Sequence, residues 1–324
     1  MRTIALEEHF ATPAFLAGPG RAMAEQARAA GVGQIPEMLA DLGAARIAAM
    51  DRAGIDVQVL SLTAPGVEQS DPPEAVALAR EANDQVAEAV RQHPDRFAAF
   101  AALPTAAPER AADELDRVVR DYGFVGAMIN GHTRGRYLDD DFFRPILARA
   151  AELQVPIYLH PTPPPRAVIE ASYLGNYPPE VGQAFATSGW GWHIETATHV
   201  LRIVLSGVFD RFPDLQLVVG HMGEGLSFMM PRFEQVMSRV VTLDRPIGEY
   251  FRSNLHYTFA AFNWTPTFLN LLLQVGIDRI LFATDHPYGS MDTARSFLDR
   301  LPIAPADRAR IAQHNAERLL GLVS

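Results

Sequence analysis

The feature of this chain that most restricts its fold is a regular alternation between short apolar runs and longer stretches with helical periodicity. Eight runs have the length and composition of buried strands, at residues 4–10, 57–62, 97–101, 125–130, 156–160, 215–221, 255–259 and 280–285. Helices of this length between strands indicate crossover connections, which join parallel strands. Because no Gly-x-Gly-x-x-Gly turn follows the first run, a closed (β/α)8 barrel of the TIM type is favoured over an open sheet.

The alternation extends over the whole chain, so we expect one domain at residues 1–324. Apolar residues make up 48% of the chain and are spread evenly, and no linker or internal repeat divides it. Two segments interrupt the pattern. We expect residues 11–35 to form a long loop with at most one short helix, followed by a helix at 36–53. We expect residues 162–189 to form an inserted loop over the carboxyl ends of the strands.

Composition excludes several classes of function. The net charge of −10 argues against nucleic acid or an anionic membrane as a partner, which leaves a small molecule. There is no cysteine, so a disulfide framework and a thiolate nucleophile are excluded. All 28 cationic residues are arginine, which rules out a Schiff-base lysine and a carbamylated lysine bridging two metal ions. Without a signal peptide or a long apolar run, we expect the protein in the cytoplasm.

The first run leads directly into Glu7, Glu8 and His9. Side chains alternate along a strand, so Glu7 and His9 share one face while Glu8 points to the other. A carboxylate and an imidazole that converge at a strand end suit zinc, manganese or iron. Glu8 is expected to pair with an arginine on the opposite face.

Three other runs also end in polar side chains, namely His160, His221 and Asp285. Each has an ordinary explanation, because His160 could be a loop residue and the other two could cap the helices that follow. All carboxyl strand ends of a barrel, however, open on one face. Their simultaneous placement there favours a metal site.

Further polar residues have less certain positions. His193, Glu195 and His199 lie around one predicted helix and are assigned to packing or support of the site. Arg232 could bind an anion through its guanidinium group. A surface salt bridge is an equally good explanation for Arg232.

Four segments carry a resemblance to a known family. Residues 6–10 (LEEHF), 158–161 (YLHP), 220–226 (GHMGEGL) and 283–287 (ATDHP) resemble the ACMSD-type branch of the amidohydrolase superfamily. More narrowly, they resemble its non-oxidative ortho-hydroxybenzoate decarboxylases. The similarity runs from the first strand to the last helix and implies a (β/α)8 barrel.

The resemblance also implies a set of site residues. One divalent ion, Zn²⁺ or Mn²⁺, would be bound by Glu7, His9, His160 and Asp285. Asp285 would also be the proton donor, and the pair of His221 and Glu224 would relay protons or orient the substrate. The candidates for substrate contact are Asn130, Arg232 and His286. Members of this family are usually dimers or tetramers, so a homodimer or homotetramer is expected.

The reaction implied is the metal-dependent, non-oxidative decarboxylation of an ortho-hydroxylated aromatic acid of the resorcylate, dihydroxybenzoate or salicylate type. The ring carbon is protonated and CO₂ is then lost, which makes the chain a carbon–carbon lyase. Two alternatives stay open: a metal-dependent hydrolase of a lactone, ester or amide (or a hydratase), and a non-enzymatic barrel. The loops at 11–35, 162–166 and 286–290 depart from the closest pattern, so the ring substituents are not predicted.

Overall fold

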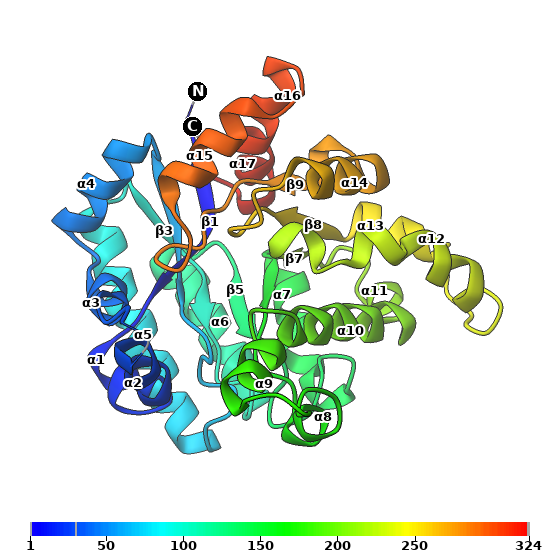
Figure 1. Cartoon of the computed structure of the whole chain (residues 1–324), viewed down its shortest axis with the longest axis horizontal. Coiled ribbons are helices and arrows are strands. Elements are labelled where there is room, and N and C mark those ends of the chain that lie inside the picture. The colour runs from blue at the N-terminus through cyan, green and yellow to red at the C-terminus, as the bar shows by residue number, and fades with distance from the viewer. Residues whose placement is uncertain (1, 30, 323–324) are drawn as a thin grey trace.

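The strands form a closed parallel barrel in a computed structural model that describes residues 2–29 and 31–322 (Figure 1). In chain order they are β1 (Ile4–Phe10), β2 (Val57–Leu62), β3 (Phe97–Ala99), β4 (Ala101–Ala102), β5 (Ala127–Asn130), β6 (Ile157–His160), β7 (Leu217–Val219), β8 (Leu255–Thr258) and β9 (Ile280–Leu281). Only Phe100 separates β3 from β4, so these two segments occupy one position in the barrel. A parallel bridge between Leu6 and Ala283 closes the ring. The predicted (β/α)8 fold is therefore confirmed.

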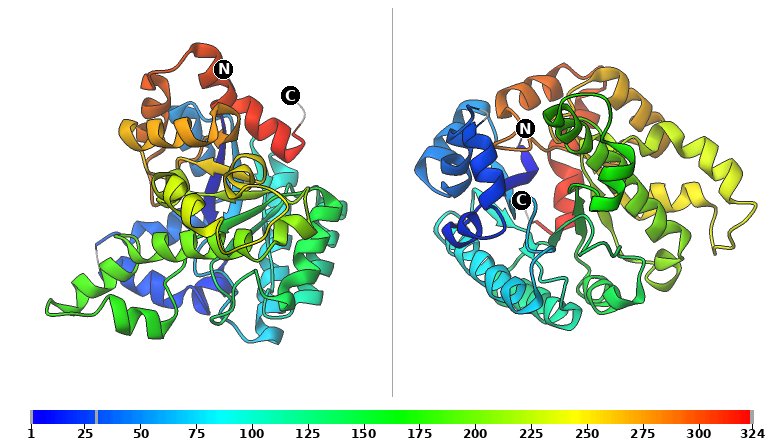
Figure 2. Two further views of the ribbon diagram at one scale, coloured as in Figure 1. Left: turned by 90° about the vertical axis from the view of Figure 1, so that its right-hand side faces the viewer. Right: turned by 60° about the horizontal axis from the view of Figure 1, so that its bottom comes forward.

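Helices surround the strands, as both views in Figure 2 show. They are α1 (Pro13–Ala17), α2 (Arg21–Ala29), α3 (Gln34–Ala40), α4 (Ala44–Ala53), α5 (Pro72–Gln92), α6 (Pro108–Tyr122), α7 (Arg144–Leu153), α8 (Arg166–Ser172), α9 (Pro179–Ala186), α10 (Gly191–Leu205), α11 (Val208–Arg211), α12 (Leu226–Met237), α13 (Ile247–Ser253), α14 (Thr265–Val275), α15 (Met291–Arg300), α16 (Pro305–Ala309) and α17 (Asn315–Leu320). Among the described residues, none of these helices is long and apolar enough to span a membrane.

The two segments predicted as loops contain more helix than expected. Residues 11–35 hold α1, α2 and the start of α3, and residues 162–189 hold α8 and α9. The helix predicted at 36–53 is interrupted, because the Asp41 carboxylate accepts hydrogen bonds from the backbone N–H groups of Gly43 (2.9 Å) and Arg46 (2.7 Å). These bonds interrupt the helix after α3, and a separate helix, α4, starts at Ala44. The expectation of a single domain stays a prediction.

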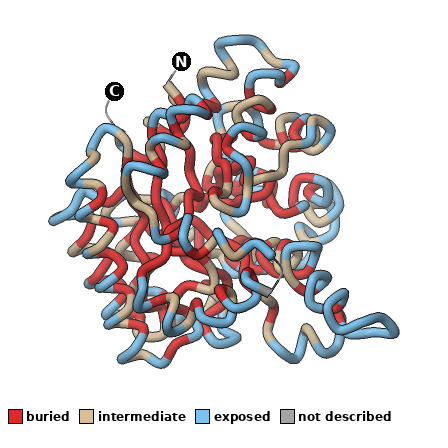
Figure 3. Tube along the Cα trace, turned by 60° about the vertical axis from the view of Figure 1, so that its left-hand side comes forward, coloured by how far each residue is buried: buried red, intermediate tan, exposed pale blue. Residues whose placement is uncertain are grey.

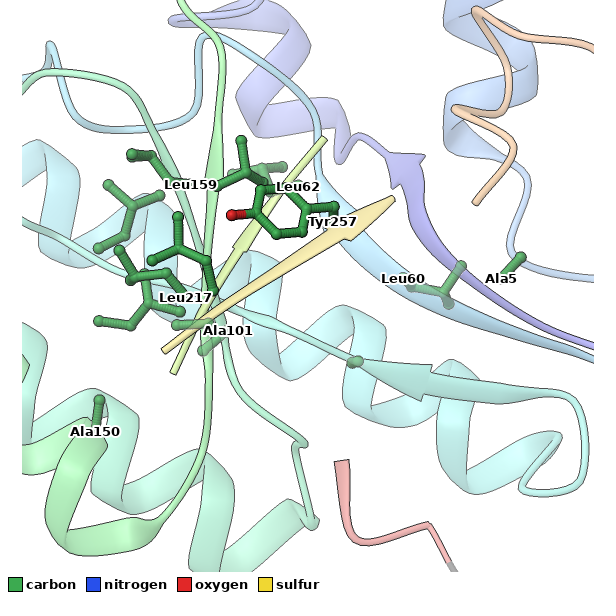
Figure 4. Packing of buried hydrophobic residues seen from close by; sticks show 14 of the residues in the cluster. Ala5, Leu60, Leu62, Ala101, Ala150, Leu159, Leu217 and Tyr257 are labelled. Atoms are coloured by element: carbon green, nitrogen blue, oxygen red, sulfur yellow. The ribbon is translucent and has the colours of Figure 1, made fainter. Parts of the chain in front are cut away.

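The buried apolar side chains form two layers, one inside the barrel and one outside it. The inner layer includes Ile4 and Leu6 from β1, with Tyr158 from β6. The outer layer lies between strands and helices and includes Ala5, Leu60, Leu159, Leu217 and Tyr257 (Figure 4). Both layers are buried, and exposed residues are confined to the periphery (Figure 3).

Strand β1 contains an irregularity that decides which acid enters the barrel. Strict alternation would place Glu8 on the inner side with Ile4 and Leu6, and Glu7 on the outer side with Ala5. The pairing of β1 with β2 shifts between Ala5 and Glu8, and Glu7 has a φ of 65°. This bulge changes the alternation, so Leu6 and Glu7 both face inward and His9 follows on the same side.

Candidate metal centre and active site

The four predicted ligands meet at the carboxyl ends of three strands. Glu7 and His9 come from β1, His160 ends β6, and Asp285 follows β9. Each offers one nitrogen or oxygen, and these four atoms lie within 4.8 Å of one another. His9 Nε2 is 3.2 Å from Asp285 Oδ1, and His160 Nε2 is 3.3 Å from Glu7 Oε1. The structure thus brings together residues that are far apart in the sequence.

The chemistry of this cluster fits a divalent cation. Glu7 Oε1 and His9 Nε2 are buried atoms with no hydrogen-bond partner among the described residues. Leaving such atoms unpaired is costly, and a cation would satisfy both. Two imidazole nitrogens and two carboxylate oxygens suit either Zn²⁺ or Mn²⁺. The assignment of these residues as ligands stays a prediction.

Glu7 is held in place by residues that the sequence did not single out. Tyr158 donates a hydrogen bond from its hydroxyl to Glu7 Oε2, and the hydroxyl of Thr258 lies 3.3 Å from the same oxygen. Burial alone would raise the pKa of Glu7, but the imidazoles of His221 and His160 outweigh burial and lower the pKa to about 2. The Glu7 carboxylate is therefore charged at neutral pH.

Glu8 lies on the outer side and has a different set of partners. Its carboxylate accepts hydrogen bonds from the backbone N–H (2.8 Å) and hydroxyl (2.6 Å) of Thr284 and from Gln58 Nε2 (2.8 Å). The prediction of a direct arginine partner is wrong, because Arg46 donates to the His9 carbonyl (2.6 Å) and contacts Gln58 Oε1 (3.4 Å). Burial raises the pKa of Glu8 to about 8.

His221 and Glu224 lie beside the cluster and are in contact with each other, and their role as a proton-relay or substrate-orienting pair stays a prediction. His221 Nδ1 is 2.7 Å from Glu224 Oε1, and His221 Nε2 is 3.7 Å from Glu7 Oε1. Burial alone would lower the pKa of His221, but the Glu224 and Glu7 carboxylates outweigh burial and raise it to about 10. His193, at the start of α10, contacts Glu224 Oε2 at 2.5 Å. Sequence reasoning had assigned His193 only to packing or support.

A cavity of about 570 Å³ adjoins these groups. His160, His221 and Asp285 contribute to its lining. Met23 in α2 and Phe262 after β8 supply apolar surface to the lining of the cavity. The segment 162–189, predicted to lie over the strand ends, contributes Pro163, Thr187 and Ser188 to the lining. Pockets of this size enclose small-molecule ligands.

The three residues predicted to contact substrate do not line this cavity. Asn130 is buried and donates its backbone N–H to Glu68 Oε1 (2.7 Å). His286 is buried as well, its carbonyl accepts from the His9 backbone N–H (2.7 Å), and burial lowers its pKa to about 3. Arg232 is exposed on α12. Within one chain, the structure does not bring these three residues to the cavity.

Comparisons with known proteins agree with this geometry. A sequence model of the family described as amidohydrolase matches residues 37–322. The chain belongs to the amidohydrolase family. Gamma-resorcylate decarboxylase from Rhizobium sp. (strain MTP-10005) is 39% identical to it, over 98% of each chain.

Two solved structures of decarboxylases in the amidohydrolase family superpose closely on this chain. A 2,6-dihydroxybenzoate decarboxylase complexed with 2,6-dihydroxybenzoate is 36% identical, with a TM-score of 0.89 over 99% of this chain and 100% of the other. A dihydroxybenzoic acid decarboxylase from Polaromonas sp. JS666, with bound manganese and the inhibitor 2-nitroresorcinol, is 36% identical, with a TM-score of 0.89 over 99% and 97%. The predicted family branch and reaction class, a metal-dependent carboxy-lyase, are confirmed.

Proposed function

We propose that this amidohydrolase removes CO₂ from an ortho-hydroxylated aromatic acid at a site formed by Glu7, His9, His160 and Asp285. The observation that carries the proposal is the buried four-residue cluster with two unpartnered donor atoms beside a cavity of about 570 Å³. A divalent ion bound there would supply positive charge to hold the acid and stabilise charge that develops on it.

Proton transfer to the ring falls to Asp285. This residue lines the cavity, and its side chain keeps 13% of its surface exposed. Asp285 gives a proton to the ring carbon that bears the carboxylate, the bond from that carbon to the carboxylate breaks, and its electron pair restores the aromatic ring. Each turnover releases one CO₂ and consumes one proton, which Asp285 must regain from its surroundings.

The walls of the cavity restrict the acids that fit. Among its described lining residues there is no arginine, so a second carboxylate on the ring would find no guanidinium to pair with within one chain, and the imidazole of His221 is already engaged by Glu224. Met23 and Phe262 instead offer apolar contact to a ring face. A single ring with one carboxylate and an ortho hydroxyl, as in resorcylate, dihydroxybenzoate or salicylate, fits this lining best.

Arg232 could contact substrate only in the cavity of a second copy of the chain, because it does not line the cavity of its own chain. It projects from α12, which also exposes Phe228 and Met229. Exposed apolar side chains beside a cation suit an interface between subunits. We therefore keep the homodimer or homotetramer and the contact of Arg232 with substrate as linked proposals. Function in the cytoplasm also stays a prediction.

The ion is either Mn²⁺ or Zn²⁺, and the donor set of two imidazoles and two carboxylates accommodates both. We favour Mn²⁺, since manganese is the ion bound in the related Polaromonas decarboxylase. Elemental analysis of the purified protein, followed by chelation and reloading with each ion, distinguishes the two.

The test of the proposed function is CO₂ release from a panel of hydroxybenzoates by protein stripped of metal and then reloaded. We expect release from ortho-hydroxylated acids only with metal present, and little from the meta- and para-hydroxylated isomers. Full activity in the stripped protein would refute the proposal. Hydrolysis of a lactone or ester without CO₂ release would replace it with the hydrolase alternative.

A further inference from the structure

His193 is the residue of the site that neither the fold nor the proposed chemistry explains. His193 lies near the N-terminus of α10 and lines the cavity, and 9% of its surface is exposed. Its Nδ1 lies 2.5 Å from Glu224 Oε2, while the other Glu224 oxygen takes His221 Nδ1 at 2.7 Å. Glu224 thus lies between two imidazoles, each on its own oxygen.

The surroundings of Nε2 decide where the proton of His193 sits. Trp192 donates its indole N–H to His193 Nε2 at 3.0 Å, which requires a lone pair on Nε2 and therefore a proton on Nδ1. The Ser188 carbonyl, 3.1 Å from Nε2, would accept a hydrogen bond only if Nε2 also carried a proton. The Glu224 carboxylate, 2.5 Å from Nδ1, offers only lone pairs, so this contact calls for a proton on Nδ1 that is donated to Glu224.

We propose that His193 is a positioning residue for the reaction, acting on His221 through Glu224. The inference rests on the proposed decarboxylation. Glu224 is fully buried, and without His193 its Oε2 would lose the only hydrogen-bond donor that reaches it among the described residues. Leaving a buried carboxylate oxygen without a hydrogen bond is costly, which would favour a reorientation of Glu224. With both oxygens occupied, Glu224 holds His221 so that Nε2 faces the cluster, 3.7 Å from Glu7 Oε1.

The contacts around the two rings support positioning rather than a second metal site. His193 and His221 meet edge to face with centroids 4.8 Å apart, and Phe262 packs against both rings at 5.1 and 5.4 Å. Each imidazole therefore has one nitrogen committed to Glu224 and an aromatic contact with Phe262. This packing fixes the ring orientations that the hydrogen bonds require.

Two variants separate the hydrogen bond from the space that His193 fills. His193→Phe keeps a ring but has no donor for Glu224, and His193→Asn offers an amide N–H near the position of Nδ1. With the metal-loaded protein, we expect kcat to fall about tenfold or more in H193F, the loss typical of a charge-assisted hydrogen bond. We expect kcat of H193N to recover to within about threefold of the native value, with KM little changed in either variant.

His199→Asn is the matched control, because His199 is buried in the same helix but accepts a hydrogen bond from the Leu138 N–H (2.8 Å), away from Glu224. H193N as slow as H193F, or a rise in KM with kcat unchanged, would overturn the positioning role. A measurement on the native protein needs no variant: ¹⁵N NMR should show a proton on His193 Nδ1. A ring protonated on Nε2 alone would refute the inference even if the native protein releases CO₂.

Discussion

Glu7 and Glu8 are adjacent and equally buried, yet they lie on opposite sides of the barrel wall and their pKa values are shifted in opposite directions. Inside, the imidazoles of His221 and His160 outweigh burial and lower the pKa of Glu7 to about 2. Outside, Glu8 accepts hydrogen bonds from the neutral donors of Thr284 and Gln58, and burial outweighs these bonds and the charge of Arg46 and raises the pKa of Glu8 to about 8. The partners, rather than the depth of burial, decide which acid carries charge.

The same division recurs at the last strand, which pairs with β1 through the bridge between Leu6 and Ala283. Thr284 holds Glu8 on the outer side, and the next residue, Asp285, reaches His9 on the inner side. The inner side is therefore specialised for the reaction, and the outer side holds β1 to its neighbours. Matched variants of adjacent residues can test this division.

The largest effect is expected at the last strand. Asp285→Asn removes the proton donor, and a lost general acid typically costs ~10²–10⁴-fold in rate. Thr284→Val, one residue away, removes a hydrogen bond to Glu8, so we expect a lower melting temperature with kcat within a few-fold of the native value. Steady-state kinetics and thermal unfolding measure both. Equal losses of kcat in the two variants would abolish the distinction between the inner and outer sides.

The next contrast compares the two acids of β1. Glu7→Gln should weaken metal binding by more than the ~10–100-fold usual for residues that only orient ligands. Glu8→Gln should bind metal normally, because its side chain faces Thr284 rather than the cluster. Metal content after dialysis against a buffered ion, together with CO₂ release, gives the comparison. Normal metal content in E7Q would remove Glu7 from the ligand set.

A smaller effect is expected from the hydroxyl that holds Glu7. Tyr158→Phe removes the hydrogen bond to Glu7 Oε2 and should weaken metal affinity by ~10–100-fold. Tyr257→Phe is the control, since Tyr257 is equally buried in the outer layer and donates to the Phe251 carbonyl (3.0 Å). Titration with Mn²⁺ should separate the two variants, whereas a similar affinity in both would mean that Tyr158 only packs.

The smallest effect concerns a third buried acid, Glu68, which has no imidazole beside it. Burial raises its pKa from 4.5 to about 7, against the hydrogen bonds from Asn130. The folded state then holds its proton more tightly than the unfolded state. The stability this contributes is complete below pH ~4.5 and is lost as the pH rises toward 7.

Glu68→Gln should remove this dependence on pH. The free energy of unfolding of the variant minus that of the native protein should therefore increase between pH 5 and 8. Denaturant titrations across that range measure the difference. A constant difference would show that Glu68 has an ordinary pKa in the folded chain.

The sequence predicted the barrel and the gathering of polar strand ends on one face, because apolar runs mark the strands and parallel strands carry their polar ends to one face. The set of four metal ligands was implied by the family resemblance and stays a prediction. The sequence could not show why Glu7 faces inward, since the bulge depends on a φ of 65° at a residue with no special preference for it. The contact of Tyr158 with Glu7 and that of His193 with Glu224 were missed for another reason, although His193 was assigned to packing or support of the site. Their contacts with Glu224 and Glu7 span 31 and 151 residues, and no local pattern records such contacts.

The three residues predicted to contact substrate do not line the cavity of a single chain, so their roles stay predictions. Asn130 ends β5 and His286 lies beyond β9, yet neither lines the cavity. The bonds that these two residues make to Glu68 and His9 come from their backbone groups, and Asn130 Oδ1 is buried without a hydrogen-bond partner among the described residues. Position along the strand indicates which end of the barrel a residue occupies. The direction of its side chain depends on local backbone geometry and on neighbours that only the fold brings together.

We propose that the metal-loaded protein decarboxylates an ortho-hydroxylated acid by protonating the ring. Turnover of 2,6-dihydroxybenzoate in D₂O by the manganese-loaded protein tests it directly. We predict that each CO₂ released is matched by one deuterium on the ring carbon that carried the carboxylate. Recovery of unchanged acid, together with hydrolysis of a lactone or ester by the same loaded protein, would contradict the account.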